Sequence, residues 1–569
     1  MGSLRDKTMK SLVEKSLAIP IFLFSICCKK DSDARPPNHL PVASLAFTIL
    51  NADPLTVSFT VTARDADNDL LSYTWDFGQG TTRNGLATET ATYEPGKTYE
   101  IKVAVSDGHS SPVNLMANLD ADVITITIDN THQFQTMQGF GGFGAKDVYW
   151  SNGPFTSSEF VSTLINDLGL TILRDNIPTN FEIANDNSDP FNTDLSKYNL
   201  HDTTWGHDGK LDDHLQYLRD MRAAGLERLI VSVWSPPPWM KTNNSISNGT
   251  NQNSAPPYNP NPTNRDNQLR PDMYREFAEM CVAYIKIIKQ ETGLEVYALS
   301  IQNEPRFSQS YASCVYNGEA LRDLVKIVGK RLDDAGLTTT LFVPEDVGWF
   351  DGADGLIQPI LADTEARQYV KFIATHGYAF DGVTASSADA QTWNDMYHWG
   401  APYNKQLWMT ETSGFPNNFK GAMDLAKAMY TAINFGNISA WLFWALSSSS
   451  LDEYCLMNSS GTRSKRYYAS KNFYRYIRPG ATRITASVPA GTETYSLAFK
   501  NEIENSQTII LINDNPTDKI IRLSGAGLPA QLNTYVTSAS DDCKDQGLVG
   551  SAHNILLPAN SVVTLYKRN

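Results

Sequence analysis

Two glutamates each follow a short apolar run, and together they could hydrolyse a glycosidic bond. Glu304 lies in Ser300-Ile301-Gln302-Asn303-Glu304-Pro305, and Glu411 ends Trp408-Met409-Thr410-Glu411. Acetal hydrolysis uses one protonated carboxyl group to release the leaving oxygen and one ionised carboxylate to attack or stabilise the anomeric carbon. The surroundings must therefore push the two pKa values apart. We predict that Glu304 and Glu411 form a catalytic pair.

The elements that would position this pair are eight short apolar strands that alternate with amphipathic helices. Helical spacing of apolar residues is clear in 273–290 and 318–335. Such alternation is typical of a (β/α)8 barrel, whose active site lies at the carboxyl ends of the strands. In this order Glu304 follows the fourth strand and Glu411 the seventh. The eight strand candidates are 138–142, 171–173, 229–233, 296–301, 341–343, 372–374, 406–409 and 440–443.

The regions on either side of the barrel show the period-two alternation of half-buried β-strands. Examples are 55–61 and 99–105 before the barrel, and 508–512 after it. We therefore predict a multidomain chain with a (β/α)8 TIM barrel, an appended β-sandwich and an N-terminal all-β domain. The expected order is a signal peptide (1–28), a tether (29–40), an immunoglobulin-like β-sandwich (41–122), the barrel (123–480, with 123–136 pairing with the C-terminal sandwich) and the C-terminal β-sandwich (481–569).

The first 33 residues have the pattern of a bacterial lipoprotein signal. Lys10 and Lys15 precede the apolar run 17–26, which is too short to cross a bilayer as a helix. Cys27 and Cys28 follow at once, and then a polar tether. We predict acylation at Cys28 (or Cys27) and an extracytoplasmic protein, lipid-anchored to the bacterial outer membrane or cell surface. A plain secretory signal is the alternative.

Charge and cysteine content narrow the function classes. The formal net charge is −15, so the chain offers little to neutralise phosphates and we expect no nucleic-acid partner. The remaining cysteines, Cys281, Cys314, Cys455 and Cys543, lack metal-ligand spacing. We expect no metal site and no cofactor. The acidic run 65–69 could hold calcium, but a solvated turn is the commoner explanation of such a run.

Four segments together resemble glycoside hydrolase family 30, and most of all its bacterial xylanase branch. They are Gln138-Gly139-Phe140-Gly141-Gly142, Trp234-Ser235-Pro236-Pro237-Pro238-Trp239-Met240-Lys241, Ile301-Gln302-Asn303-Glu304-Pro305 and Leu407-Trp408-Met409-Thr410-Glu411. The resemblance implies a barrel fused to a β-sandwich and hydrolysis with retention. It also implies that Glu304 is the acid/base and Glu411 the nucleophile. Separately, Tyr73-Thr74-Trp75-Asp76-Phe77-Gly78 resembles the PKD family of immunoglobulin-like modules, which implies spacing or display.

Further residues at the predicted strand ends suit sugar binding. Arg174 matches the family's strand-two arginine, which would keep the nucleophile ionised. Asn303 is placed to hydrogen-bond a sugar 2-hydroxyl group, and Glu345 would support the other two glutamates. Any single aromatic residue here could instead be barrel packing. The remaining predicted substrate-binding residues are Trp234, His376, Tyr378, Trp444 and Trp150.

Two departures from the family bear on specificity. Glucuronate-dependent members carry an arginine soon after the strand-eight tryptophan, whereas Trp444 is followed here by Ala445, Leu446 and four serines. Serine cannot make a bidentate charged pair with a carboxylate. Arg306 could contact an acidic decoration, although loop arginines are usually solvated. The long segments 179–210 and 245–268 are expected to shape subsites.

Three functions remain open at this point. The first is an endo-acting hydrolase of a β-linked plant polysaccharide, β-1,4-xylan, without strict dependence on glucuronate. The second keeps the mechanism but acts on a β-1,6-glucan or β-1,6-galactan. The third is a catalytically inactive surface lipoprotein that binds glycans. In each case the partner is a β-linked polysaccharide or oligosaccharide, and the membrane is reached only through the N-terminal lipid anchor.

Overall fold

The computed structural model describes residues 37–144, 157–201, 211–248, 267–348, 355–378 and 389–568. The predicted signal peptide with Cys27 and Cys28, and Trp150 in the first βα loop, lie outside these residues. None of the described helices is long and apolar enough to cross a membrane. Cys281, Cys314, Cys455 and Cys543 are all buried free thiols.

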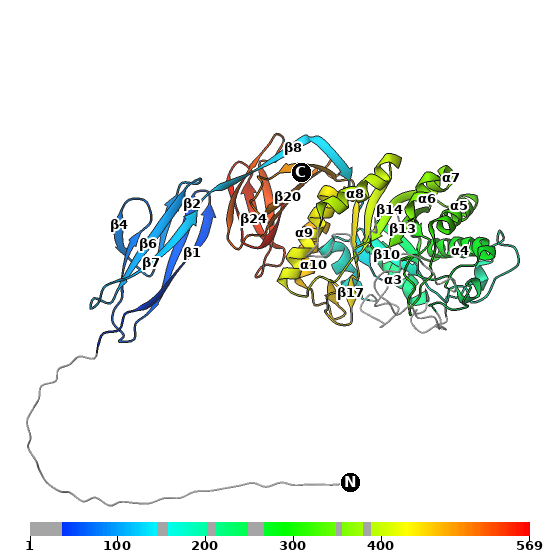
Figure 1. Ribbon diagram of the computed structural model, residues 1–569, viewed down its shortest axis with the longest axis horizontal. Coiled ribbons are helices and arrows are strands. Elements are labelled where there is room, and N and C mark those ends of the chain that lie inside the picture. Colours follow the sequence, from blue (N-terminus) through cyan, green and yellow to red (C-terminus); the bar gives the residue numbers. More distant parts are fainter. Residues whose placement is uncertain are drawn as a thin grey trace, which may run out of the picture. The chain divides into compact units, whose positions relative to one another are not determined.

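The N-terminal region is all β, and its strands form two sheets (Figure 1). Trp75 is fully buried, and its ring stacks on that of Phe77 with the ring centroids 5.4 Å apart. One sheet has the order β1 (Val42–Ala52), β2 (Leu55–Arg64) and β5 (Thr88–Tyr93). The other has the order β4 (Thr82–Gly85), β3 (Ser72–Asp76), β6 (Thr98–Ser106) and β7 (Val113–Asp120).

Eight parallel strands close into the predicted barrel. Its interior is filled by large apolar side chains that alternate along the strands, among them Phe342, Phe372 and Trp408. The strands are β9 (Gly139–Phe143), β10 (Ile172–Ile177), β11 (Arg228–Val233), β12 (Val296–Ser300), β13 (Thr340–Asp346), β14 (Val370–His376), β15 (Gln406–Glu411) and β16 (Ala440–Phe443). All eight strands predicted from the sequence are therefore present.

The first barrel strand is glycine-rich because its neighbours approach it very closely. A Cβ atom on Gly141 would lie 1.7 Å from the Ile172 carbonyl oxygen, and one on Gly142 would lie 2.7 Å from the Phe443 carbonyl oxygen. Only glycine allows β9 to pair with both β10 and β16 at this spacing. The Gly-Phe-Gly-Gly motif thus closes the barrel.

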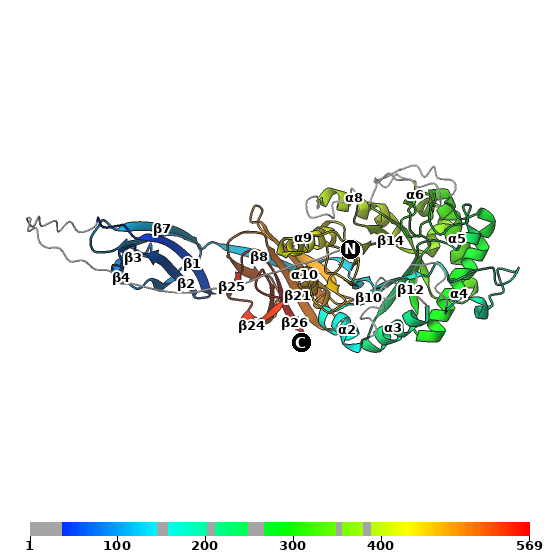
Figure 2. The same ribbon diagram turned by 90° about the horizontal axis from the view of Figure 1, so that it is seen from below.

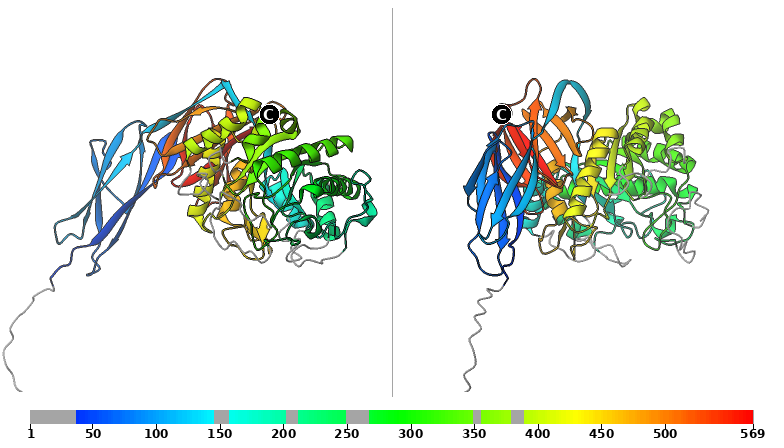
Figure 3. Two further views of the ribbon diagram at one scale, coloured as in Figure 1. Left: turned by 45° about the vertical axis from the view of Figure 1, so that its right-hand side comes forward. Right: turned by 60° about the vertical axis from the view of Figure 1, so that its left-hand side comes forward.

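Helices cover the outside of the barrel (Figures 2 and 3). The two helices predicted at 273–290 and 318–335 are α4 (Tyr274–Thr292) and α5 (Gly318–Asp334). The others are α2 (Ser158–Ser162), α3 (Leu211–Ala224), α6 (Ile357–Ala362), α7 (Thr364–Tyr369), α8 (Ala390–Gly400), α9 (Phe419–Phe435) and α10 (Lys465–Tyr474). Shorter turns are the π-helix η2 (Thr163–Leu168) and the 3-10 helices η3 (Leu195–Lys197), η4 (Pro238–Met240), η5 (Pro271–Met273) and η6 (Ala401–Tyr403).

The C-terminal domain is one continuous nine-stranded sheet, in the order β24-β23-β26-β21-β20-β19-β8-β22-β25. It still forms a sandwich, since residues from its two halves, such as Ile521 of β22 and Val563 of β26, share one apolar core. The long β8 (Val123–Thr136) pairs with both β19 and β22. The other strands are β19 (Thr482–Ser487), β20 (Thr494–Asn501), β21 (Ser506–Asn513), β22 (Lys519–Ser524), β23 (Gln531–Thr537), β24 (Lys544–Gly550), β25 (Asn554–Leu557) and β26 (Ser561–Arg568).

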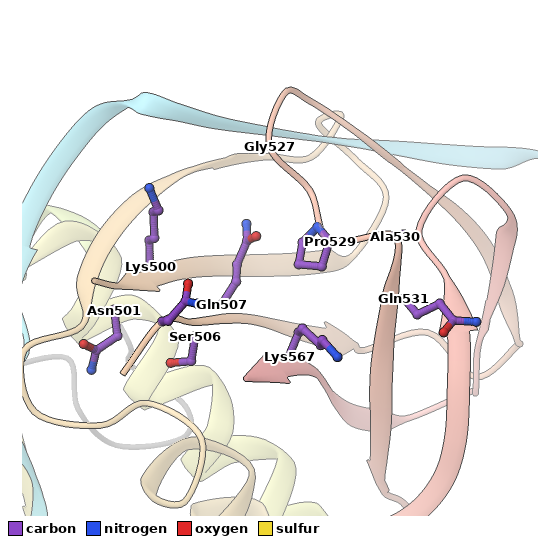
Figure 4. A pocket seen from close by; sticks show the side chains of 10 residues that line it. Lys500, Asn501, Ser506, Gln507, Gly527, Pro529, Ala530, Gln531 and Lys567 are labelled. Atoms are coloured by element: carbon purple, nitrogen blue, oxygen red, sulfur yellow. The ribbon is translucent and has the colours of Figure 1, made fainter. Parts of the chain in front are cut away.

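A polar surface pocket of about 470 Å³ lies on this domain (Figure 4). Its lining includes Lys500, Gln507, Gln531 and Lys567. Aromatic side chains, which would offer a flat platform for a sugar ring, are absent from the described residues that line it. Lys500 is also paired with Glu502 at 2.6 Å. The pocket therefore gives no indication of a second sugar site.

Candidate active site

The carboxyl ends of the barrel strands bring the predicted site residues together. Arg174 lies on β10, Glu345 on β13, His376 on β14 and Glu411 on β15, and Glu304 follows β12. Backbone hydrogen bonds between neighbouring strand ends fix this ring. Asn303 N donates to Val233 O at 2.7 Å, Glu304 N to Glu345 O at 2.9 Å, and Gly377 N to Glu411 O at 2.8 Å.

Glu304 and Glu345 both adopt left-handed backbone conformations, with φ of 51° and 58°. This region is costly for a residue with a long side chain, and such strain concentrates at functional sites. The two residues are held there by the hydrogen bond that joins their backbones. Both strained residues stand at strand ends and direct their carboxyl groups into the site.

Arg174 is the hub of the charged network. Its guanidinium donates from Nε to Glu345 Oε1 at 2.8 Å, from Nη1 to Glu411 Oε2 at 2.6 Å and from Nη2 to Asn303 Oδ1 at 2.6 Å. The side chain is fully buried. Such charge-assisted hydrogen bonds in a buried setting favour the ionised form of a carboxylate. Arg174 therefore holds the Glu411 carboxylate in place and orients the amide of Asn303.

His376 links the two glutamates of the predicted pair. Its Nδ1 lies 3.1 Å from Glu304 Oε1 and 3.8 Å from Glu411 Oε2, and its ring is fully buried. Burial alone would lower the pKa of His376, but the negative charge of Glu411 and the hydrogen bonds with Glu304 and Glu345 raise that pKa to about 9. At neutral pH the imidazole is therefore a cation.

The charges in the site balance when one carboxyl group carries a proton. Glu304, Glu345 and Glu411 face two cations, Arg174 and protonated His376. Burial acts to raise the pKa of Glu345, but Arg174 and His376 lower it to about 2. Burial raises the pKa of Glu304, although its hydrogen bond with His376 opposes this effect. Glu304, whose pKa is raised, is thus better suited than Glu345 to carry that proton.

One oxygen of Glu304 and one of Glu411 lie within 4.8 Å of each other, with an imidazole nitrogen of His376 equally near. These three side chains could in principle bind a metal ion. However, Arg174 already donates directly to Glu411, and His376 contacts both glutamates. Ion pairs within the protein therefore account for the cluster.

An aromatic wall flanks the charged groups. The ring of Trp444 stacks on that of Phe143 with the ring centroids 4.3 Å apart, and the centroids of Trp234 and Trp444 are 6.1 Å apart. The Arg174 guanidinium lies 4.7 Å from the centre of the Trp234 ring, so one face of that ring is already used. Both tryptophans are half-buried, which leaves part of each ring available to a sugar.

Tyr378 is influenced directly by the catalytic residue Glu411, whereas Arg306 is paired with Asp346. The Tyr378 hydroxyl lies 3.3 Å from Ser413 Oγ, and burial together with Glu411 raises the Tyr378 pKa well above its usual value. Arg306 is not solvated as loop arginines usually are, because it forms a buried ion pair with Asp346 at 3.1 Å. Burial raises the pKa of Asp346 to about 6 despite this partner.

Sequence reasoning missed Tyr311 and Phe143. Tyr311 lies in the loop after β12 with 47% of its surface exposed, and burial of its hydroxyl together with the charges of Glu304 and Glu411 raises its pKa. An exposed ring so near the catalytic groups suits stacking on a sugar. Phe143 immediately follows the Gly141-Gly142 motif, and that position was the available signal. For Tyr311 the sequence offered none.

Known proteins resemble the N-terminal β region of the chain and the region that follows it. A family model described as PKD domain matches residues 38–121. Glucuronoxylanase XynC of Bacillus subtilis (strain 168) is 26% identical over 320 residues, which cover 54% of this chain and 69% of that protein. An endo-1,6-beta-D-glucanase of Neurospora crassa is 24% identical over 429 residues, covering 68% of this chain and 81% of that protein.

A solved structure shares the fold as well. It is the glycoside hydrolase family 30 subfamily 8 xylanase Xyn30A of Clostridium acetobutylicum, with a TM-score of 0.61 and 24% identity. The match covers 78% of this chain and all of that one. The resemblance predicted from the sequence motifs, to family 30 with a PKD module in front, is confirmed.

Proposed function

We propose that this chain, a homologue of the family 30 glycoside hydrolases, is a retaining, endo-acting hydrolase of a β-linked plant polysaccharide. The observation that carries the proposal is the short separation of Glu304 and Glu411, which have oxygens within 4.8 Å of each other. Retaining enzymes hold their two carboxyl groups about 5–5.5 Å apart, whereas inverting enzymes need about 6.5–9.5 Å to admit a water molecule.

The first step separates the sugar from its leaving group. Glu304, whose pKa burial raises, gives its proton to the glycosidic oxygen as the bond to the anomeric carbon breaks. Glu411, paired with Arg174, attacks the opposite face of that carbon through one carboxylate oxygen. The products of this step are a covalent glycosyl-enzyme ester on Glu411 and a departing sugar with a free hydroxyl group.

The second step restores the enzyme. Glu304, now ionised, removes a proton from a water molecule, and the water oxygen attacks the anomeric carbon and releases Glu411. Two inversions give net retention. His376 helps in both steps, because its cationic ring stabilises the charge of Glu304 once the proton has left.

The substrate we favour is β-1,4-xylan without a required glucuronate branch. Trp444 is followed by Ala445, Leu446 and four serines, and Ser447 and Ser448 are buried in the short strand β17 (Ser447–Ser448), paired with β18 (Met457–Asn458). This segment supplies no guanidinium group for a uronate. The likeness to a β-1,6-glucanase supports β-1,6-glucan as the alternative, with the same two glutamates.

A catalytically inactive glycan-binding protein is the contrasting possibility. The complete network of Glu304, Glu411, Arg174 and His376 argues against it, because a protein that only binds sugar has no use for two buried carboxyl groups held close together by an arginine and a histidine. We also propose lipid attachment at Cys28 (or Cys27), on the sequence pattern alone. Metabolic labelling with a fatty acid that is lost in the double variant Cys27→Ala, Cys28→Ala would support it, and unchanged labelling would contradict it.

The decisive test of the substrate is a panel of xylan, glucuronoxylan, β-1,6-glucan and arabinogalactan, with the products sized. We expect oligosaccharides of several lengths from xylan, at a rate comparable to that from glucuronoxylan. Strong preference for glucuronoxylan would contradict the argument from the serine segment, and cleavage of β-1,6-glucan alone would replace xylan as the substrate. No cleavage of any polymer by a folded protein would favour the binding function.

A further inference from the structure

Four carboxylates outside the active site act on one another electrostatically where a loop meets a helix. Glu182 and Asp186 belong to the long segment after β10, and Glu276 and Glu279 lie three residues apart on α4. Residues three apart project from the same side of a helix. The chain thus brings four acidic side chains from two elements to one junction.

The loop is packed firmly against α4. The Phe181 ring lies 5.3 Å from that of Tyr284 on α4, and the Arg275 guanidinium lies 5.9 Å from the Phe191 ring. Asn199 N donates to Phe181 O at 2.7 Å and ties the two ends of the loop together. The backbone of Glu182 is also fixed, because its carbonyl oxygen accepts a hydrogen bond from Trp239 Nε1 at 3.1 Å.

Two of these carboxylates are buried and two are half-buried, and all four have few partners. Glu182 and Glu279 are each only 1% exposed. Among the residues that the structure describes, neither carboxylate oxygen of Glu279 has a partner in good hydrogen-bond geometry, although the side chain of Thr193 is near enough to act against the rise of its pKa. One buried oxygen each of Glu182, Asp186 and Glu276 also lacks a partner. Buried charges in proteins are paired or coordinate metal ions, because an isolated buried carboxylate is very costly.

The basic residue that influences this group is held elsewhere. Arg331 on α5 acts on Glu279 from a distance, but its guanidinium donates to Pro190 O, Phe191 O and Thr193 Oγ1. Burial and the mutual repulsion of the carboxylates raise the pKa of Glu182 to about 9 and, despite Arg331, that of Glu279 to about 7. Both shifts mean that the protein alone offers these carboxyl groups too little positive charge to keep them ionised.

We propose that Glu182, Asp186, Glu276 and Glu279 bind a calcium ion that fastens the loop after β10 to α4. All the ligands are oxygen atoms, as calcium prefers, and nitrogen or sulfur ligands typical of zinc are not among them. Asn185, which hydrogen-bonds Glu276, could add an amide oxygen. The ion would fix a loop that holds Trp239, in the same motif as Trp234 of the active site.

The affinity should be weak. Among the described residues, no three of these carboxylates have oxygens within 4.8 Å of one another, unlike the cluster of Glu304, His376 and Glu411. The side chains must therefore close around the ion. Extracellular calcium modules commonly bind in the range of about 0.1–1 mM, and we expect a similar range here.

The test is thermal unfolding of the full chain at pH 8 in EDTA, in CaCl2 and in MgCl2. We expect calcium at about 10 mM to raise the melting temperature of the barrel by about 2–4 °C, with little effect of magnesium. Glu279→Gln and Glu182→Gln should each lose most of this rise. Glu295→Gln is the matched control, because Glu295 is exposed beside Lys289, and it should respond like the native protein.

Each alternative outcome has a clear reading. If the native protein gains nothing from calcium, the proposal is wrong. It is also wrong if Glu279→Gln and Glu182→Gln melt higher than the native protein in EDTA and keep the full calcium response. That result would mean that these carboxyl groups are simply protonated, and that the acidic run 65–69 or another site binds calcium. A rise with magnesium as large as with calcium would contradict the choice of ion.

Discussion

Two buried groups of carboxylates lie toward the carboxyl ends of the barrel strands, and the protein treats them in opposite ways. Around Glu304, Glu345 and Glu411, each carboxyl group contacts Arg174 or His376, and one proton completes the balance of charge. Around Glu182, Asp186, Glu276 and Glu279, buried carboxylate oxygens are unpartnered among the described residues. The contrast teaches that burial alone does not make an acid catalytic. A buried acid becomes useful for catalysis when it has specific charged or hydrogen-bonding partners, because these set its pKa.

The largest expected effect comes from removing the nucleophile. Glu411→Ala should lower kcat on polysaccharide by roughly 10^4-fold or more, because covalent attack at the anomeric carbon is lost. Circular dichroism and melting temperature should confirm that the variant is folded. Activity near the native level would remove Glu411 from this role and with it the distinction between the two groups.

The second largest effect tests the hub. Arg174→Met leaves Glu345 and Glu411 buried without their guanidinium partner, so we expect a loss of about 3–5 kcal/mol in the free energy of unfolding. The matched control is Arg322→Met on the surface of α5, where the loss should stay below about 1 kcal/mol. Equal losses in the two variants would show that Arg174 compensates no buried charge.

The third prediction concerns the acid. Glu304→Ala should lower kcat about 10^2–10^4-fold on polysaccharide but much less on aryl glycosides with good leaving groups, which need no proton. Equal losses on both substrates would contradict the acid/base role.

The pH profile of the native enzyme gives an independent view of the same group. Glu304 acts while protonated, so activity must fall as pH rises through its pKa, which burial raises. His376 opposes that rise, so His376→Gln should move the alkaline limb of kcat/KM to higher pH. A shift to lower pH would contradict the proposed coupling.

The smallest effect on catalysis should come from the second group. Glu279→Gln should leave kcat within about threefold of native in EDTA, since this carboxylate lies outside the catalytic network and a neutral amide fits its site. A loss as large as that of Glu304→Ala would join the two groups into one functional unit.

Much of the fold could be predicted from the sequence because each barrel strand is a short buried apolar run. The prediction failed where polar residues are buried: β10 continues through Arg174, Asp175 and Asn176 to Ile177, although only 171–173 are apolar. Their burial depends on partners from distant strands, such as Glu345 and Glu411, which no local pattern reveals. The junction at Glu182 escaped prediction for the same reason, since only the folded loop brings it to α4.

The candidate site was more predictable than its surroundings. Strand ends in a barrel share one face, so Glu304, Glu411, Arg174 and His376 could be placed from strand order alone. Tyr311 and the buried state of Arg306 could not, because loop conformation decides them. The substrate is hardest to predict for the same reason, because loops shape the substrate-binding site. The strand ends, in contrast, determine the catalytic chemistry.

The anomeric form of the first product tests the central claim most directly. Proton NMR during the first minutes of hydrolysis, before mutarotation, distinguishes the two forms of the new reducing end. With Glu304 and Glu411 this close together, we predict that the β-anomer appears first and the α-anomer only later. Initial appearance of the α-anomer would mean inversion, and would contradict the double displacement through Glu411.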